Sequence, residues 1–336
     1  MRQDRDMSDD VLAALLLTNR ISGADVDPLT ASQFWRCVGA VPEGLGTLLG
    51  LSAGEIGERT GLDRATAERV AALLDAATGF ALERERLENN GIAMVAALDE
   101  RYPARLRERL RDAAPPILYV AGPVEWLSTG WLGIVGSRNV SGAGGEVARR
   151  SAEVAVRLGR ALVSGAARGV DQVAMAAALE NDGPVVGVTT EGLARVGRRA
   201  DLRRAVTEGR LCLATPYAPD AGFSAGAAMG RNKIIYAIAD ATLVVASDHG
   251  SGGTWRGATE ALKRGYGRVL VWRGDGEGPG NAPLEALGAT PVTSLDTLAD
   301  VLASVEDPDP ADPVHPSVTP AEQLPLTFPE PSDAVG

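Results

Sequence analysis

Four short segments rich in glycine, serine and arginine contain the residues of this chain that could bind an anion. Each is expected to form a loop near a strand end or a helix start, where small residues let backbone N–H groups approach a phosphate. A helix N-terminus adds partial positive charge, and arginine or lysine adds a full charge. The candidate phosphate-binding residues are Gly136, Ser137, Arg138 and Ser141; Ser164, Gly165, Arg168 and Gly169; Arg231, Asn232 and Lys233; and Ser251, Gly252, Gly253 and Thr254.

The same segments lack the spacings of the common nucleotide-handling enzymes. After Gly136 the next glycine is Gly142, so the first segment is not G-x-G-x-x-G, and no G-x-x-x-x-G-K-[ST] occurs. The two histidines, His249 and His315, are isolated, and no Ser-His-Asp or Cys-His group can be assembled. Asp171 is expected to cap a helix rather than to act as a base. The sequence therefore predicts binding rather than catalysis, with no catalytic residue, cofactor or metal ion.

The elements that must position these segments alternate between strand and helix from residue 86 to residue 304. Strands are predicted at Ile117–Val120, Leu132–Val135, Ala161–Val163, Val185–Thr189, Leu211–Ala214, Thr242–Ala246 and Val269–Trp272, and several of these are short continuous apolar runs, as expected of buried parallel strands. Helices are predicted between them at Gly144–Gly159, Val170–Asn181, Ala225–Ala239 and Thr254–Arg264. This order predicts an α/β fold with a doubly wound, mostly parallel sheet. Ligands of such sheets bind beyond the carboxyl ends of the strands.

Residues 1–85 have a different pattern and are expected to form a helical N-terminal domain. Apolar stretches at 11–17, 31–38, 53–59 and 65–77 lack strand-like alternation. Thr60-Gly61-Leu62 lies between two of them and resembles the turn of a helix-hairpin-helix, which can offer N–H groups to a DNA phosphate. Asp63 stands where a second glycine is usual, and its carboxylate would repel phosphate. Simple helix packing is therefore the alternative interpretation.

The last segment, 305–336, is expected to be a disordered acidic tail. It contains eight of the 20 prolines and accounts for seven of the eleven net negative charges. No run of about 18 apolar residues occurs, and the N-terminus is charged, so we expect a soluble cytoplasmic protein without a membrane span.

A basic stretch interrupts this acidic chain between residues 194 and 210. It contains six arginines, Arg195, Arg198, Arg199, Arg203, Arg204 and Arg210, against Asp201 and Glu208. A solvated helix face would explain it, and so would a track for a phosphate backbone.

The order of these motifs resembles the DNA-processing protein A (DprA/Smf) family. The resemblance runs from residue 91 to residue 289 and rests on YPARLRERLRDAAPPILYVAGP, GIVGSRNVSGAGG, ALVSGAARGVDQVAMAAAL, GRNKIIYAIADATLVVASDHGSGGTWRGATEALKRG and PGNAPLEALGA. It implies an extended Rossmann-like domain that binds single-stranded DNA, usually as a homodimer, and that loads a RecA-type recombinase during recombination or DNA uptake (transformation). It places the family's DNA-binding residues on the four segments above.

This chain departs from the family pattern at three places. Val173-Ala174-Met175 stands where Ala-His is frequent, and the Tyr-Pro pair is loosened to Tyr217-Ala218-Pro219. Ala228-Met229-Gly230 replaces the aromatic residue expected just before Arg231. An aromatic there would provide a platform on which a base stacks, so its absence predicts weaker or different DNA binding.

The tail contains a further motif. Gln323, Leu324, Leu326 and Phe328 fit a Gln-Leu-x-Leu-x-Phe peptide of the kind that docks in the bacterial sliding clamp.

Two alternatives to single-stranded DNA binding stay open. One is a nucleotide-binding sensor on a related Rossmann-like fold, which would serve defence against foreign DNA. A phosphoribohydrolase of the same fold is disfavoured, because Gly257 stands where Pro-Gly-Gly-x-Gly-Thr-x-x-Glu requires glutamate. The other is a scaffold whose pocket is vestigial and whose tail recruits the partner.

Overall fold

The computed structural model describes residues 7–20, 26–129, 131–197 and 199–304. A sheet of nine strands lies at the centre, in the order β1-β2-β6-β5-β4-β3-β7-β8-β9. β1 pairs antiparallel with β2, and β2 antiparallel with β6, whereas all other neighbours are parallel. The strands are β1 Ala93–Ala96, β2 Ile117–Ala121, β3 Trp131–Val135, β4 Ala161–Ser164, β5 Val185–Val188, β6 Leu211–Thr215, β7 Ala241–Val244, β8 Arg268–Trp272 and β9 Thr290–Val292.

The predicted mixed α/β fold with a mostly parallel sheet is confirmed, and each of the seven predicted strands is present, with β2 antiparallel to both of its neighbours. The sequence patterns did not reveal the two outermost strands, β1 and β9. Both are short, and β9 contains Pro291, which lacks a backbone N–H. Proline is tolerated at a sheet edge, where one side of the strand needs no hydrogen-bond donor. Short edge strands of this kind give little periodic signal.

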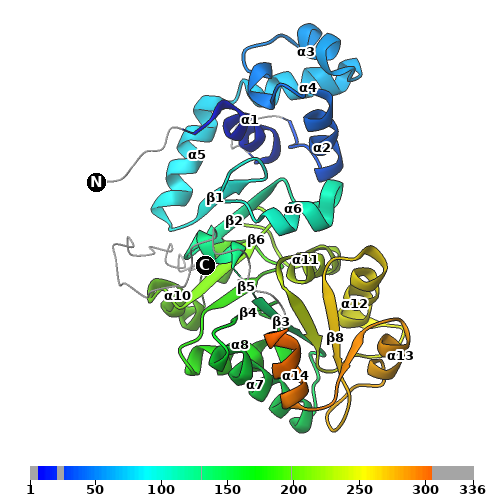
Figure 1. Cartoon of the computed structure of the whole chain (residues 1–336). Helices are drawn as coiled ribbons and strands as arrows, with labels where there is room; N and C mark the ends of the chain where they lie inside the picture. The colour runs from blue at the N-terminus through cyan, green and yellow to red at the C-terminus, as the bar shows by residue number, and fades with distance from the viewer. Residues whose placement is uncertain (1–6, 21–25, 130, 198, 305–336) are drawn as a thin grey trace, which may run out of the picture.

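Helices cover both faces of the sheet (Figure 1). α7 and α8 cross between β3, β4 and β5 on one face, and α14 packs against α7 there. α11 and α12 pack together on the other face, where α11 lies against β3, β4, β5 and β7. These helices are α7 Gly142–Arg157, α8 Val170–Glu180, α9 Leu193–Val196, α10 Ala200–Thr207, α11 Ala225–Ile238, α12 Gly252–Arg264, α13 Asn281–Ala286 and α14 Leu295–Ala303.

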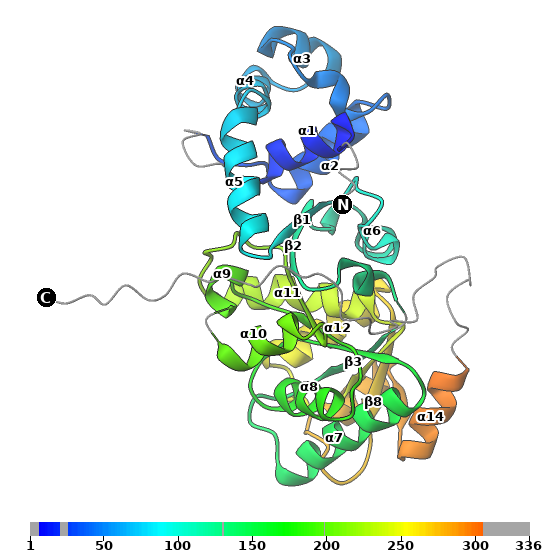
Figure 2. The same cartoon turned by 90° about the vertical axis from the view of Figure 1, so that its left-hand side faces the viewer.

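The N-terminal helices pack at the β1 end of the sheet (Figure 2). They are α1 Asp9–Thr18, α2 Ala31–Ala40, α3 Ala53–Thr60, α4 Arg64–Leu74 and α5 Ala77–Asn89, with α6 Ala104–Leu110 following β1. Short 3₁₀ turns lie at Leu45–Leu48, Arg111–Ala113 and Val124–Ser128. The helix expected at 65–77 is present as α4, which ends three residues earlier, at Leu74; α5 begins at Ala77. α5 also continues through the expected domain boundary at 85/86, and the division into domains stays a prediction.

The hairpin between α3 and α4 shows what Asp63 does. Gly61 ends α3 in the left-handed conformation, with φ +67°. Asp63 then caps α4, because its carboxylate accepts hydrogen bonds from the Thr66 backbone N–H at 3.0 Å and from the Thr66 hydroxyl at 2.6 Å. A carboxylate thus occupies the position at this helix N-terminus that a DNA phosphate would take.

Candidate nucleic-acid interface

The strand order reverses direction at β3, and the candidate residues gather there. From β3 the chain proceeds through β4, β5 and β6 to one side, then crosses back to place β7 on the other side of β3. In an open α/β sheet, the crevice beyond the carboxyl ends of strands at such a reversal is the usual ligand site. The loops after β3 (136–141), β4 (165–169) and β7 (245–251) all lie at this edge, and α11 passes beside them. We call this edge the rim.

Glycine lets the first two loops of the rim pack against each other. A Cβ on Gly136 would lie 2.5 Å from a methyl group of Val170, and one on Gly169, whose φ is +89°, would lie 2.3 Å from the Ser137 carbonyl oxygen. Such contacts are far inside van der Waals distance, so only glycine fits. The Ser137 N–H donates to the Ala246 carbonyl at 2.8 Å, which joins the first loop to the loop after β7.

Arg231 and Asp171 form a buried ion pair beneath the rim. Arg231 Nη1 lies 3.8 Å from Asp171 Oδ2, and the two side chains are only 5% and 7% exposed. The backbone N–H groups of Ala167, Gly165 and Gly136 also lie near enough to the Asp171 carboxylate to lower its pKa. Burial raises the pKa of Asp171, while the Arg231 charge and these N–H groups oppose that shift. Asp171 therefore fixes two loops and one arginine, a wider role than the helix cap expected from sequence.

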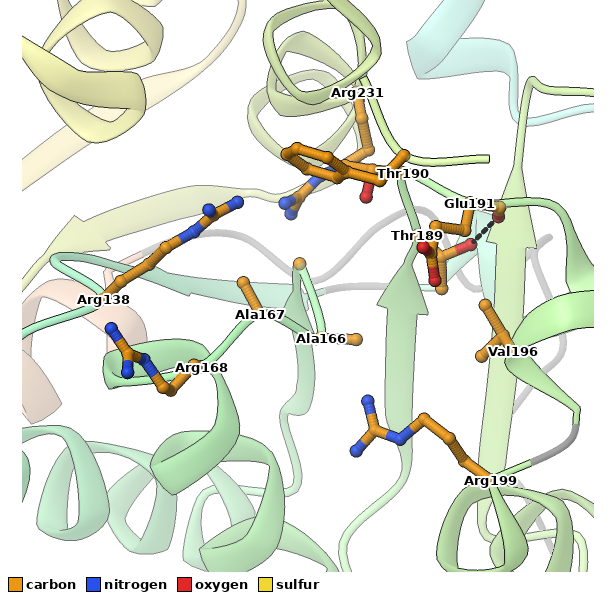
Figure 3. Close-up of a pocket in the computed structure, with 12 residues that line it drawn as sticks. Arg138, Ala166, Ala167, Arg168, Thr189, Thr190, Glu191, Val196, Arg199 and Arg231 are labelled. Carbon is orange, nitrogen blue, oxygen red and sulfur yellow. Dashed lines mark hydrogen bonds between the residues drawn. The ribbon is translucent and has the colours of Figure 1, made fainter. Parts of the chain in front are cut away.

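Two adjoining pockets open on the rim. The first, which we call the α12 pocket, has a volume of about 430 Å³ and reaches the N-terminus of α12. The second, the arginine pocket, has a volume of about 390 Å³ and is shown in Figure 3. Their shared lining residues are Arg138, Ala167, Phe223 and Arg231.

The α12 pocket contains polar groups with no protein partner. Ser251 is the residue that precedes α12, and its side chain accepts no hydrogen bond from the first N–H groups of that helix. Among the described residues, the buried Tyr236 hydroxyl and Arg231 Nε make no hydrogen bond. Both residues line this pocket, with these two atoms buried beneath its surface. Buried polar groups are normally paired, so a small movement of the pocket wall that admits ordered water or a ligand group would satisfy these atoms. With Arg138 and Arg256 also lining it, the pocket favours an anion despite Asp248.

An exposed phenylalanine that the sequence patterns did not single out stands between the two pockets. Phe223 is 51% exposed, and the Arg138 guanidinium lies 5.4 Å from the centre of its ring. Met229, 42% exposed, lies nearby in the α12 pocket. The rim therefore has an aromatic surface although residues 228–230 contain none. Phe223 was missed because it precedes Arg231 by eight positions, and only the turn into α11 brings it to the rim.

Most of the predicted phosphate-binding residues line one of the pockets. Arg231 lines both, as does Arg138. Others line one pocket each. They are Gly136, Ser137, Asn232, Ser251, Gly252, Gly253 and Thr254 in the α12 pocket, and Gly165 and Arg168 in the arginine pocket. The convergence of these segments on one edge was expected from sequence; their contact with DNA stays a prediction.

Four of the predicted residues lie elsewhere. Ser141 caps α7 by accepting from the Gly144 N–H at 3.1 Å. The Ser164 side chain is buried and donates to the Ile134 carbonyl at 2.6 Å. Gly169 provides the turn into α8. Lys233 lies outside both pockets; burial lowers its pKa, which the charges of Glu260 and Asp112 oppose.

The third segment is not a loop. Ser224 caps α11 by accepting from the Ala227 N–H at 3.0 Å, so Arg231, Asn232 and Lys233 lie inside that helix. Residues on successive helical positions point in different directions, which is why Arg231 and Lys233 separate. Gly230 leaves room for the Tyr217 hydroxyl, because a Cβ there would lie 2.6 Å from that oxygen and Tyr217 would have to shift.

The basic stretch divides in the same way. Glu208 forms ion pairs with Arg204 at 2.7 Å and Arg210 at 2.5 Å, so these two arginines neutralise an acid on the surface of α10. Arg199 instead lines the arginine pocket. Of the described arginines in this stretch, Arg199 lines a pocket, whereas Arg204 and Arg210 pair with Glu208. Arg198 and the Asp201 side chain lie outside the described residues.

Some other expectations fall partly or wholly outside the described chain. Gln323, Leu324, Leu326 and Phe328 lie outside it, as does the whole segment 305–336.

Within the described ranges, no three His, Cys, Asp or Glu side chains are grouped as metal ligands. No helix in those ranges has the length and apolarity needed to span a bilayer.

Comparison with solved structures supports this fold. The chain is similar to DNA processing protein A from Streptococcus pneumoniae, with a TM-score of 0.65 and 23% identity, covering 89% of this chain and 99% of that one. It is also similar to DNA processing protein A from Helicobacter pylori, whose structure was described for its single-stranded DNA binding mode. There the TM-score is 0.54 and the identity 21%, covering 63% of this chain and 95% of that one.

Comparison of sequences gives the same relatives. The chain is 29% identical over 177 residues to the DNA processing protein DprA of Bacillus subtilis, covering 52% of this chain and 59% of that protein. It is 28% identical over 250 residues to a putative DNA processing protein DprA of Mycobacterium tuberculosis, covering 70% and 60%. The chain thus spans about 60% of the length of these relatives. The sequence model of DNA recombination-mediator protein A matches residues 93–303. This chain therefore belongs to the DNA recombination-mediator protein A family.

Proposed function

We propose that this protein binds single-stranded DNA at the rim and acts in DNA processing or recombination as a binding protein rather than an enzyme. The observation that carries the proposal is the convergence of Arg138, Arg168 and Arg231 with the N-terminus of α12 at one sheet edge. Membership of the family supports it, and so does the likeness to the H. pylori protein. A polyanionic strand gains from several cationic contacts at once, whereas a single metabolite needs fewer.

The test removes two rim charges without disturbing the buried ion pair. Arg138→Ala with Arg168→Ala should weaken binding to every single-stranded sequence, measured by fluorescence anisotropy over a range of salt concentrations. The slope of log affinity against log salt should become shallower by about 0.7 for each phosphate that the variant no longer neutralises. The control is Arg157→Ala with Arg203→Ala, two exposed arginines outside both pockets. A wild-type protein without measurable binding at low salt would refute the proposal.

The partners extend the same proposal. By its family resemblance the protein loads a RecA-type recombinase in the cytoplasm and works as a homodimer. Light scattering of the full chain tests the dimer, and pull-down with the recombinase on DNA tests loading. The sliding clamp is proposed from Gln323 to Phe328 alone; deletion of these six residues should abolish clamp binding, and unchanged binding would exclude the motif as the docking peptide.

The nucleotide-sensor alternative is favoured by the volume of the arginine pocket, which is large enough for a small ligand. A thermal-shift screen separates the two functions, because a ligand that binds only the folded state raises its stability. Stabilisation by a mononucleotide but not by oligonucleotides would favour the sensor.

A further inference from the structure

The rim presents two pockets, and one nucleotide of a strand could occupy only one of them. The wall between the pockets is made of Arg138, Ala167, Phe223 and Arg231. That wall is fixed from below, since Arg231 is held by Asp171 and fits closely over Gly165, where a Cβ would lie 1.3 Å from Arg231 Nη1. The pockets are therefore separate but adjoining compartments of one surface.

The arginine pocket has its own charged groups, drawn from different elements. Arg138 lies in the loop after β3 and Arg168 in the loop after β4. Arg199 is the residue that precedes α10. Figure 3 shows Arg138 and Arg168 on one side of the cavity and Arg199 on another, with its guanidinium directed toward the cavity. Arg168 is oriented by Asn139, whose Oδ1 accepts from Arg168 Nη2 at 2.7 Å. Guanidinium groups at separate points suit successive phosphates of a chain.

The remaining lining suits a base rather than a phosphate. Thr189, Thr190 and Glu191 lie at the end of the cavity away from Arg138, and the buried Thr189 hydroxyl donates to the Glu191 carbonyl at 2.8 Å (Figure 3). Glu191 carries negative charge and would repel a phosphate, whereas hydroxyl and carboxylate groups accept or donate hydrogen bonds at a base edge. Val196 and the Phe223 ring add apolar surface. The volume of about 390 Å³ is at the small end of ligand pockets, which fits one nucleotide.

We propose that the arginine pocket is a second nucleotide subsite, which takes the base of a nucleotide adjoining the one bound in the α12 pocket. The strand passes over Phe223 between the two, with its backbone on Arg138 and Arg168 and a further phosphate on Arg199. This inference rests on the proposed function. It adds the position of a second subsite, the path of the DNA strand over Phe223, and the requirement that a strand be long enough to reach both pockets.

The experiment compares Arg199→Ala with Arg203→Ala, which removes the same charge one helical turn along, outside both pockets. Binding of thymidine oligonucleotides of increasing length is measured by anisotropy. Wild type and Arg203→Ala should gain affinity once the strand reaches both pockets. Arg199→Ala should lose about tenfold on long strands and nothing on the shortest that bind. Thr190→Trp, which fills the cavity, should behave like Arg199→Ala, and circular dichroism checks that each variant is folded.

Three outcomes overturn the inference. Wild-type affinity for long strands in both Arg199→Ala and Thr190→Trp would show that the pocket is not used. An equal loss at every length, or an equal loss in Arg203→Ala, would show a general charge effect rather than a second subsite. In each of these cases wild type still binds single strands, so the proposed function stands. Absence of binding by wild type would instead remove both.

Discussion

Arg231 from α11 and Asp171 from α8 meet at 3.8 Å beneath the rim, in a setting that excludes nearly all solvent. The pair joins helices from opposite faces of the sheet at the point where the strand order reverses. A single carboxylate thereby pairs with one arginine and lies beside backbone N–H groups of two loops, which lower its pKa. The geometry of the rim therefore depends on this contact.

The first prediction concerns that pair. Asp171→Asn leaves the Arg231 charge buried without its counter-ion, which should lower the free energy of unfolding by about 3–5 kcal/mol. Urea denaturation of the full chain measures this. The double variant Asp171→Asn with Arg231→Met should recover much of the loss, because no unpaired charge then remains buried. A single variant as stable as wild type would contradict the structural role of the pair.

The second prediction concerns Gly165, whose missing side chain makes room for the Arg231 guanidinium. Gly165→Ala places a methyl group on that guanidinium, so it should destabilise the protein by about 1–3 kcal/mol and weaken single-stranded DNA binding. Gly145→Ala is the control, because nothing lies within 4 Å of a Cβ built there, inside α7. That variant should gain about 0.5–1 kcal/mol and bind DNA normally. If both variants behave alike in thermal unfolding, the close approach at Gly165 is not real.

The third prediction concerns the exposed ring of Phe223. Phe223→Ala should weaken binding to single strands by about 1–3 kcal/mol, because it removes a stacking surface and the partner of Arg138. Its unfolding temperature should change little, since half of the ring is already exposed. Phe223→Trp should retain binding. Leu82→Ala, an exposed apolar residue on α5, is the control and should leave anisotropy titrations unchanged.

The fourth prediction concerns acid and the helix caps of α3 and α4. The Thr66 side chain and backbone N–H lower the pKa of Asp63, and the Ser52 side chain and backbone N–H lower the pKa of Glu55. A carboxylate with a lowered pKa binds fewer protons folded than unfolded, so its contribution is complete above the ordinary pKa of about 4. It is lost as pH falls through the lowered value.

Thermal unfolding between about pH 6 and pH 3 checks this. Asp63→Asn keeps a side-chain acceptor at the cap but cannot titrate, so its unfolding temperature should fall less with acid than that of wild type. Glu68→Gln on the exposed face of α4 is the matched control. An identical acid response in Asp63→Asn and wild type would show that the cap contributes nothing to the pH dependence.

The class of fold could be predicted from the sequence, because buried parallel strands are continuous apolar runs. Such runs can be recognised without knowing which strands lie beside them. It also placed Arg138, Arg168 and the Ser251–Thr254 turn at one edge, since the carboxyl ends of parallel strands share an edge by construction. Edge strands such as β9 could not be predicted, because they are short and pair with a neighbouring strand on one side only.

Tertiary structure alone decided which of the candidates face a ligand. Arg231 and Lys233 are two positions apart in one helix, and the helical rotation sends one to the pockets and the other toward Glu260. Arg199 and Arg204 lie in one basic run, yet Arg199 lines a pocket whereas Arg204 forms an ion pair with Glu208 on the surface. Phe223 reached the rim through a turn that leaves no periodic pattern. Side-chain direction and pairing depend on contacts between segments distant in the chain, and for that reason composition and spacing could not supply them.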